Sequence, residues 1–103
     1  MVHDGPWTDE QDDFLIAVRT KFPNLKWENI RVEFMVEFHY QGQPVETPVK
    51  DISSRYHVKL KKEARAAAYG NYLATGEMNE EHQAFIVKAE RIVARFSSTA
   101  NDD

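Results

Sequence analysis

Residues 8–22 constrain the fold most, because they carry both a start signal and a stop signal for a helix. Thr8, followed three residues later by Gln11, fits a capping box, in which each side chain accepts a hydrogen bond from the other residue's backbone N–H. Acidic residues crowd the first turns, where the positive end of the helix dipole stabilises them: Asp9, Glu10, Asp12 and Asp13. Apolar residues then recur at helical spacing until Pro23, so we predict a helix over 8–22.

The next segment fits two structures. Between Ile30 and Tyr40 apolar and polar residues alternate almost without exception, and a period of two is typical of a strand. A competing helical pattern begins at Trp27, from which Ile30 and Phe34 follow at i+3 and i+7. We expect a helix over about 25–37, for a reason that comes from the whole chain.

A third helix is expected after a loop at residues 41–46. Thr47 suits the capping position, and Pro48 suits the first helical position because its missing N–H needs no partner there. One apolar face and a run of alanines favour a single long helix: Val49, Ile52, Tyr56 and Leu60, then Ala64, Ala66, Ala67 and Ala68. Gly70, or at the latest Gly76, would end it.

A last helix over residues 80–96 is predicted, with Asn79 as its cap. Its apolar stripe has helical spacing: Phe85, Ile86, Ala89, Ile92, Val93 and Phe96. We expect this stripe to pack on the other helices; a dimer or partner surface through 80–96 is the alternative. The pattern predicts one domain over 6–96, with a flexible N-terminus at 1–5 and a disordered tail at 97–103.

Positive charge is concentrated in one part of the chain. The formal net charge is −4, which by itself speaks against a nucleic-acid partner. Residues 50–65, however, carry six bases and two acids, whereas residues 1–49 carry nine acids and four bases. Because salt screens each charge beyond about 8 Å, a local basic patch can act independently of the total. A merely solvated helix face is the other interpretation of this pattern.

Catalytic and metal chemistry have no candidate residues in the sequence. The chain has no cysteine, which excludes disulfides, thiolate metal sites and cysteine nucleophiles. Its histidines lack metal-ligand spacing, and Ser53 and Ser54 lack the context of an activated nucleophile. No apolar run is long enough to cross a membrane. We expect a binding module that uses no cofactor, is no enzyme and does not span a membrane.

Three parts of the chain together resemble the Myb/SANT domain, over about residues 6–62. They are Trp7-Thr8-Asp9-Glu10-Gln11-Asp12-Asp13-Phe14-Leu15, then Trp27-Glu28-Asn29-Ile30 with Phe34, then Arg55-Tyr56 with Leu60. The resemblance implies an all-α, three-helix, helix-turn-helix bundle like that of a homeodomain, with Trp7, Trp27 and Tyr56 packed together at the centre of the core. It is also why we prefer a helix at 25–37. The expanded connection between helices 2 and 3 and the additional C-terminal helix are similar to plant trihelix domains.

The resemblance also implies that the third helix enters the major groove of double-stranded DNA. Lys50, Ser54 and Val58 align with the family's base-facing residues. A Lys can donate to guanine, a Ser discriminates weakly, and a Val can meet a thymine methyl. The other DNA-binding candidates are Ser53, His57, Lys59, Lys61, Lys62 and Arg65, of which the lysines and the arginine suit phosphates.

Arg55 has a structural role in the family, where the Arg before the third aromatic commonly pairs with an acid of helix 1. Glu10 is the partner we expect, ahead of Asp13. DNA binding, in a nuclear transcription or chromatin regulator, is our main hypothesis. The alternatives are a SANT-type module that binds a histone tail or regulatory partner through the acids at 9–13, and a dimerisation or scaffold domain that uses the last helix.

Overall fold

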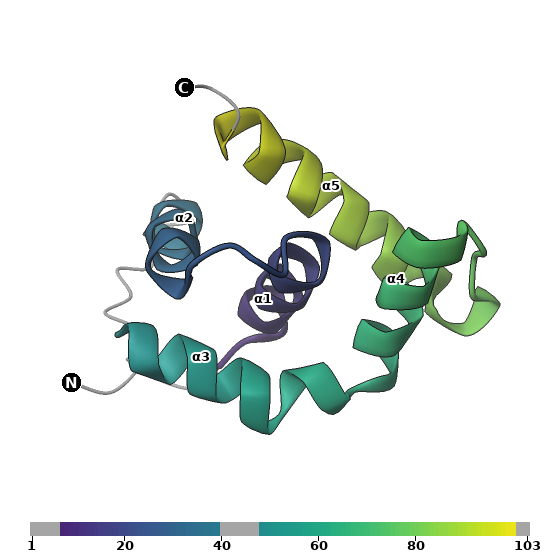
Figure 1. Cartoon of the computed structure of the whole chain (residues 1–103), viewed down its shortest axis with the longest axis horizontal. Coiled ribbons are helices and arrows are strands. Elements are labelled where there is room, and N and C mark those ends of the chain that lie inside the picture. The colour runs from purple at the N-terminus through teal and green to yellow at the C-terminus, as the bar shows by residue number, and fades with distance from the viewer. Residues whose placement is uncertain (1–6, 40–47, 101–103) are drawn as a thin grey trace.

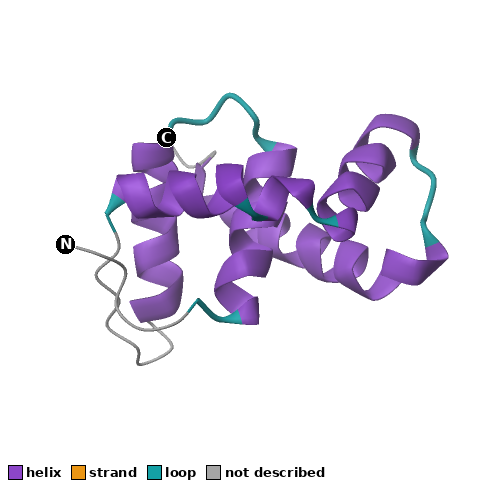
Figure 2. Cartoon of the chain, turned by 90° about the horizontal axis from the view of Figure 1, so that it is seen from below, coloured by secondary structure: helices purple, strands orange, loops and turns teal. Residues whose placement is uncertain are grey.

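The computed structural model describes residues 7–39 and 48–100, and every regular element in these two ranges is a helix (Figures 1 and 2). The α-helices are α1 (Asp9–Lys21), α2 (Trp27–His39), α3 (Val49–Val58), α4 (Ala64–Thr75) and α5 (Gln83–Ala100). Two short 3-10 turns, η1 (Leu60–Lys62) and η2 (Glu80–His82), precede α4 and α5. The all-α prediction is confirmed, but residues 7–39 and 48–100 form five α-helices where four were expected.

The central helix is α1, and each of the other α-helices packs against it (Figure 1). Residues 11–18 are all buried, so two turns of α1 are covered on every side. The predicted capping box is present: the Thr8 N–H donates to Gln11 Oε1 at 3.0 Å, and the Gln11 N–H donates to Thr8 Oγ1 at 3.1 Å. The first helix and its start are therefore confirmed.

The ambiguous segment forms α2, a helix rather than a strand. Ile30, Phe34 and Phe38 make its buried row at i, i+4 and i+8, and the Phe34 and Phe38 ring centroids lie 4.8 Å apart. Val32 and Val36, which the alternating pattern would have placed with them, are 54% and 46% exposed. Helical packing of every fourth residue thus decides between the two patterns.

The predicted long third helix is wrong, because the chain turns between Val58 and Ala64. Lys62 N–H and Glu63 N–H donate to carbonyls only three residues back, those of Lys59 and Leu60, and Glu63 is extended. The turn buries the side chain of Leu60 completely and directs α4 back along α1, where Ala66, Ala68 and Tyr69 are buried. In a straight continuation of α3, residues 64–75 would extend a further ~18 Å along the helix axis instead of lying against α1.

The starts of the later helices follow their local signals in part. Asn79 caps as predicted, since its side chain accepts from the N–H groups of Glu81 (2.9 Å) and His82 (3.3 Å) in the turn that leads into α5. α3 begins at Val49, one residue later than expected, so Pro48 occupies the capping position and not the first helical position. The predictions for the N-terminus at 1–5, the loop at 41–46 and Thr47 fall outside the described residues.

The apolar stripe of α5 belongs to the chain's own core. Ile86, Ala89, Ile92, Val93 and Phe96 are buried, and Phe85 is partly buried against them. The stripe therefore packs within the chain, as expected, and is not an open surface for a partner. α5 continues to Ala100, beyond the predicted end at 96. Residues 97–100, which were predicted to belong to a disordered tail, are therefore helical.

The three aromatic residues of the Myb/SANT pattern lie at the edge of the core, not at its centre. Trp7, Trp27 and Tyr56 are each partly buried. Trp27 packs on Tyr56 with 5.6 Å between ring centroids, while Trp7 packs on Phe34 at 6.0 Å. The centre is instead made by fully buried side chains from all five α-helices and η1: Leu15, Ile16, Val18, Ile30, Phe34, Ile52, Leu60, Tyr69 and Ile86.

Among the helices of the described residues, none has the length and apolar character that a membrane crossing requires.

Two glycines give a matched test of the helix boundaries. Gly76 ends α4 with a φ of 79°, so Gly76→Ala should lower the free energy of unfolding by about 1 kcal/mol through backbone strain. Gly70 lies inside α4, and a Cβ there would meet only Thr20 Cγ2, at 3.8 Å. Gly70→Ala should therefore raise the free energy of unfolding by about 0.5 kcal/mol. Urea unfolding of both variants measures this; effects of the same sign would contradict the assigned boundary.

Candidate nucleic-acid interface

One face of α3 points away from the rest of the molecule. Lys50, Ser54, His57 and Val58 are exposed, and their spacing places them on one side of the helix. Ile52 is fully buried on the other side, toward α1 and α2. In Figure 1 α3 runs along an edge of the fold, across α1 from α5. The base-facing candidates Lys50, Ser54 and Val58 therefore share one accessible surface.

Lysines continue this surface beyond the end of α3. Lys59, Lys61 and Lys62 are exposed in the turn that contains η1. Lys59 Nζ lies 3.8 Å from Glu63 Oε2, but Lys50, Lys61 and Lys62 have no ion-pair partner among the residues that the structure describes. The segment after α3 thus displays two ammonium groups, those of Lys61 and Lys62, that no carboxylate of the described residues neutralises.

His57 is oriented by aromatic contacts from α2 and α3. Its ring centroid lies 5.8 Å from that of Trp27 and 5.5 Å from that of Tyr56. Arg19 covers the Trp27 ring at 4.6 Å and donates to the Leu25 carbonyl at 2.8 Å. Sequence reasoning missed Arg19, whose one signal was a base in the last turn of the first helix.

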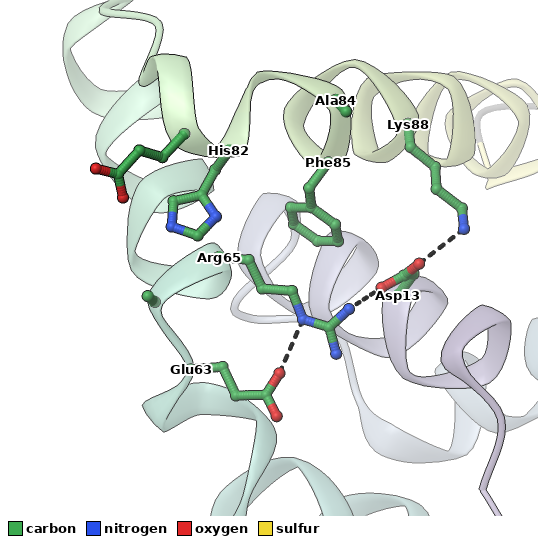
Figure 3. Close-up of a pocket in the computed structure, with 9 residues that line it drawn as sticks. Asp13, Glu63, Arg65, His82, Ala84, Phe85 and Lys88 are labelled. Atoms are coloured by element: carbon green, nitrogen blue, oxygen red, sulfur yellow. Dashed lines mark hydrogen bonds and ion pairs between the residues drawn. The ribbon is translucent and has the colours of Figure 1, made fainter.

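Two of the predicted DNA contacts, Ser53 and Arg65, are bonded to groups of the chain itself. The Ser53 hydroxyl donates to the Lys50 carbonyl at 3.2 Å, so it satisfies its own helix. Arg65 is not a surface cation: its guanidinium pairs with Asp13, donates to Glu63 at 2.8 Å and lies 5.4 Å from the Phe85 ring (Figure 3). The turn after α3 directs this side chain inward, which a continuous helix would not have done.

Arg55 forms the expected structural ion pair, but with Asp12 instead of Glu10. Its Nε and Nη2 donate to the two carboxylate oxygens of Asp12 at 3.0 and 2.7 Å. Asp12 is buried, and this hydrogen bond raises the pKa of Arg55. Two residues of helix correspond to a rotation of about 200°, so Glu10 and Asp12 point to nearly opposite sides of α1.

Glu10 and Asp13 both pair with a lysine of α5. Lys88 Nζ donates to Glu10 Oε1 and to Asp13 Oδ2, both at 2.7 Å. Since Asp13 also pairs with Arg65, the carboxylate of this one buried residue ties α1 to α4 and α5 (Figure 3). The acidic start of the chain is thus largely neutralised from within.

A wide surface hollow of about 530 Å³ lies beside this network, between the starts of α4 and α5 (Figure 3). Asp13, Glu63, Arg65 and Lys88 line it, and all four are already paired with one another or with their neighbours. Among the described residues no group of three or more His, Asp or Glu side chains could hold a metal ion. The other titratable residues that line the hollow are Glu81 and His82, so it offers a ligand only two such groups outside these ion pairs.

Comparison with protein-family models, with curated proteins and with solved structures found no match to this chain. The resemblance to the Myb/SANT domain stays a prediction, and a functional proposal rests on the chain's own residues.

The identity of the Arg55 partner can be tested by stability. Asp12→Ala should lower the free energy of unfolding by about 3 kcal/mol, because it leaves a partly buried guanidinium without its carboxylate. Glu10→Ala should cost at most about 1 kcal/mol, since Glu10 is exposed and its pairing is at the surface. Chemical denaturation gives both values; a cost for Glu10→Ala as large as that for Asp12→Ala, or larger, would contradict the assignment of Asp12.

Alkaline pH should destabilise the fold through two groups. Burial, with help from the charge and hydrogen bond of Glu90, raises the pKa of Tyr69 above its ordinary value of 10.0. Burial lowers the pKa of Lys88, but hydrogen bonds with Asp13 and Glu10 outweigh it and raise the pKa above 10.5. Both groups hold their proton more tightly when folded, so their stabilisation is complete below pH 10 and is lost as pH rises through the folded pKa values.

Urea unfolding at about pH 8 and about pH 11 measures this loss. Tyr69→Phe, which cannot ionise, should show a smaller decline than the unchanged chain. A free energy of unfolding that rises between the two pH values would show that the sign is wrong.

Proposed function

We propose that this chain is a DNA-binding module of a nuclear transcription or chromatin regulator, which places the outer face of α3 in the major groove. The observation that carries the proposal is the contrast between the two kinds of charge. Lys50, Lys61 and Lys62 have no ion-pair partner among the residues that the structure describes, whereas Glu10, Asp12 and Asp13 of α1 are paired within the chain. A chain with a net charge of −4 can therefore still present a positive surface at α3.

The chemistry of this surface supports binding that depends mainly on phosphates. Lys61 and Lys62 follow the helix, where they could reach the DNA backbone on either side of the groove. Lys50 is the exposed lysine of α3 and could donate to guanine, while Ser54 discriminates weakly and Val58, 70% exposed, offers only apolar contact. We therefore expect moderate sequence preference and strong salt dependence.

The histone-tail alternative is weaker on physical grounds. It needs accessible carboxylates near the start of α1. Asp12 and Asp13 are 4% and 5% exposed and bound to arginine or lysine side chains, and Glu10 is bound to Lys88. Asp9 is the exposed acid that remains from that cluster. A basic tail would have to displace ion pairs that hold the fold together.

The test is a titration of double-stranded DNA at about 50 and about 200 mM salt, where phosphate-driven binding should fall steeply. Replacing Lys61 and Lys62 by Gln should weaken binding to all sequences and reduce the slope of log affinity against log salt by about 2. Lys50→Ala should instead relax the preference selected from a randomised pool.

The matched control replaces Lys61 and Lys62 by Arg, which keeps both charges and should preserve the slope. If the unchanged chain fails to bind DNA at the lower salt, or if the Gln and Arg variants have the same slope, the proposal fails. Binding of basic peptides by the unchanged chain would then favour the protein-interaction alternative.

A further inference from the structure

A groove runs between α2 and α5, on a different side of the molecule from the outer face of α3. Two adjoining hollows of about 180 and 190 Å³ lie along α5, and both are lined by Phe14, Glu37, Ile92 and Arg95. One extends toward Lys88 and the other toward Phe96, so they follow successive turns of the helix. Arg95 Nη2 and Glu37 Oε1, 3.2 Å apart, bridge the two walls.

Beside the groove, α2 exposes an apolar ridge. Val32 and Val36 are 54% and 46% exposed, one helical turn apart, and Val36 also lines one of the hollows. The same patch of surface therefore carries both an exposed apolar pair and a depression beside it. Patches that combine knob and hole are suited to a partner with the same shape, that is, a second copy related by a two-fold axis.

The charges on the groove walls have the same self-complementary arrangement. Glu33 stands on the α2 wall and Arg91 on the α5 wall. Neither has an ion-pair partner within the described parts of the chain. A two-fold axis that runs parallel to the groove exchanges the walls, so that the α2 wall of one copy, with Glu33, would face the α5 wall of the other, with Arg91.

We propose that this face is a homodimer interface, in which Val32 and Val36 of each copy enter the α2–α5 groove of the other and Glu33 faces Arg91 across the two-fold axis. The surface differs from the apolar stripe of α5, which is buried in the monomer. None of the residues that line the two hollows belongs to α3, and α3 runs along the edge of the fold opposite α5 (Figure 1). Dimerisation through this face does not require DNA binding, and a separate measurement tests it.

The test is sedimentation equilibrium of the full chain, with charge-reversed variants. Glu33→Arg and Arg91→Glu should each weaken dimerisation by about tenfold or more, because each places like charges opposite one another. The double variant exchanges the two charges and should recover most of the lost affinity. This recovery is expected of an interface that pairs the two residues and is not expected of a general effect of net charge.

Matched controls are Glu77→Arg and Lys26→Glu, which make the same changes of charge at exposed positions outside the groove and should dimerise normally. Val36→Asp should abolish dimerisation, with circular dichroism to confirm that it folds. If Val36→Asp does not fold, the Glu33 and Arg91 variants decide whether the chain dimerises through this face. A monomer throughout the micromolar range, or a double variant as weak as the single ones, would overturn the proposal.

Discussion

Two buried carboxylates of the central helix hold the arrangement together. Asp12 and Asp13 lie among eight consecutive buried residues of α1, where an unpaired negative charge would be strongly unfavourable. Arg55 from α3, Arg65 from α4 and Lys88 from α5 supply the compensating charge. Because each cation comes from a different helix, satisfying the two carboxylates specifies where three helices must sit. The apolar core supplies most of the driving force for folding, but these pairs select one packing among several.

The parts of the structure with a local chemical cause were predictable from the sequence. Thr8 with Gln11, Asn79 and Gly76 each satisfy or terminate backbone hydrogen bonds within a few residues, so their roles could be predicted correctly. The turn after Val58 has no such cause, since no Gly or Pro lies between Val49 and Tyr69. It exists because Leu60 and α4 bury more surface against α1 than a straight helix would. The same turn explains why the prediction of Arg65 as a DNA contact failed. Because α4 folds back on α1, the Arg65 guanidinium is paired with Asp13 and Glu63.

The candidate interface was predicted to a similar extent. Exposure of Lys50, Ser54, Val58 and the lysines after α3 followed from the spacing of apolar residues on the opposite face. The spacing did not predict which acid of α1 pairs with Arg55, because that depends on the rotation of α1 about its axis relative to the neighbouring helices. Glu10 and Asp12 are equally acidic and two residues apart, yet one faces Lys88 and the other Arg55. Periodicity within one helix carries no information about which neighbouring helix each side is turned toward.

The contact between α1 and α5 has a consequence for how the chain acquires its structure. The hydrogen bond from Lys88 to Asp13 joins residues 75 positions apart, and α5 covers a large part of α1. During synthesis α1 therefore emerges long before the helix that shields it, and its apolar and acidic side chains stay hydrated until α5 has also been made. Such a topology favours late, concerted folding over stepwise addition of stable pieces. Until then these side chains are open to other partners, so the nascent segment should depend on chaperone protection.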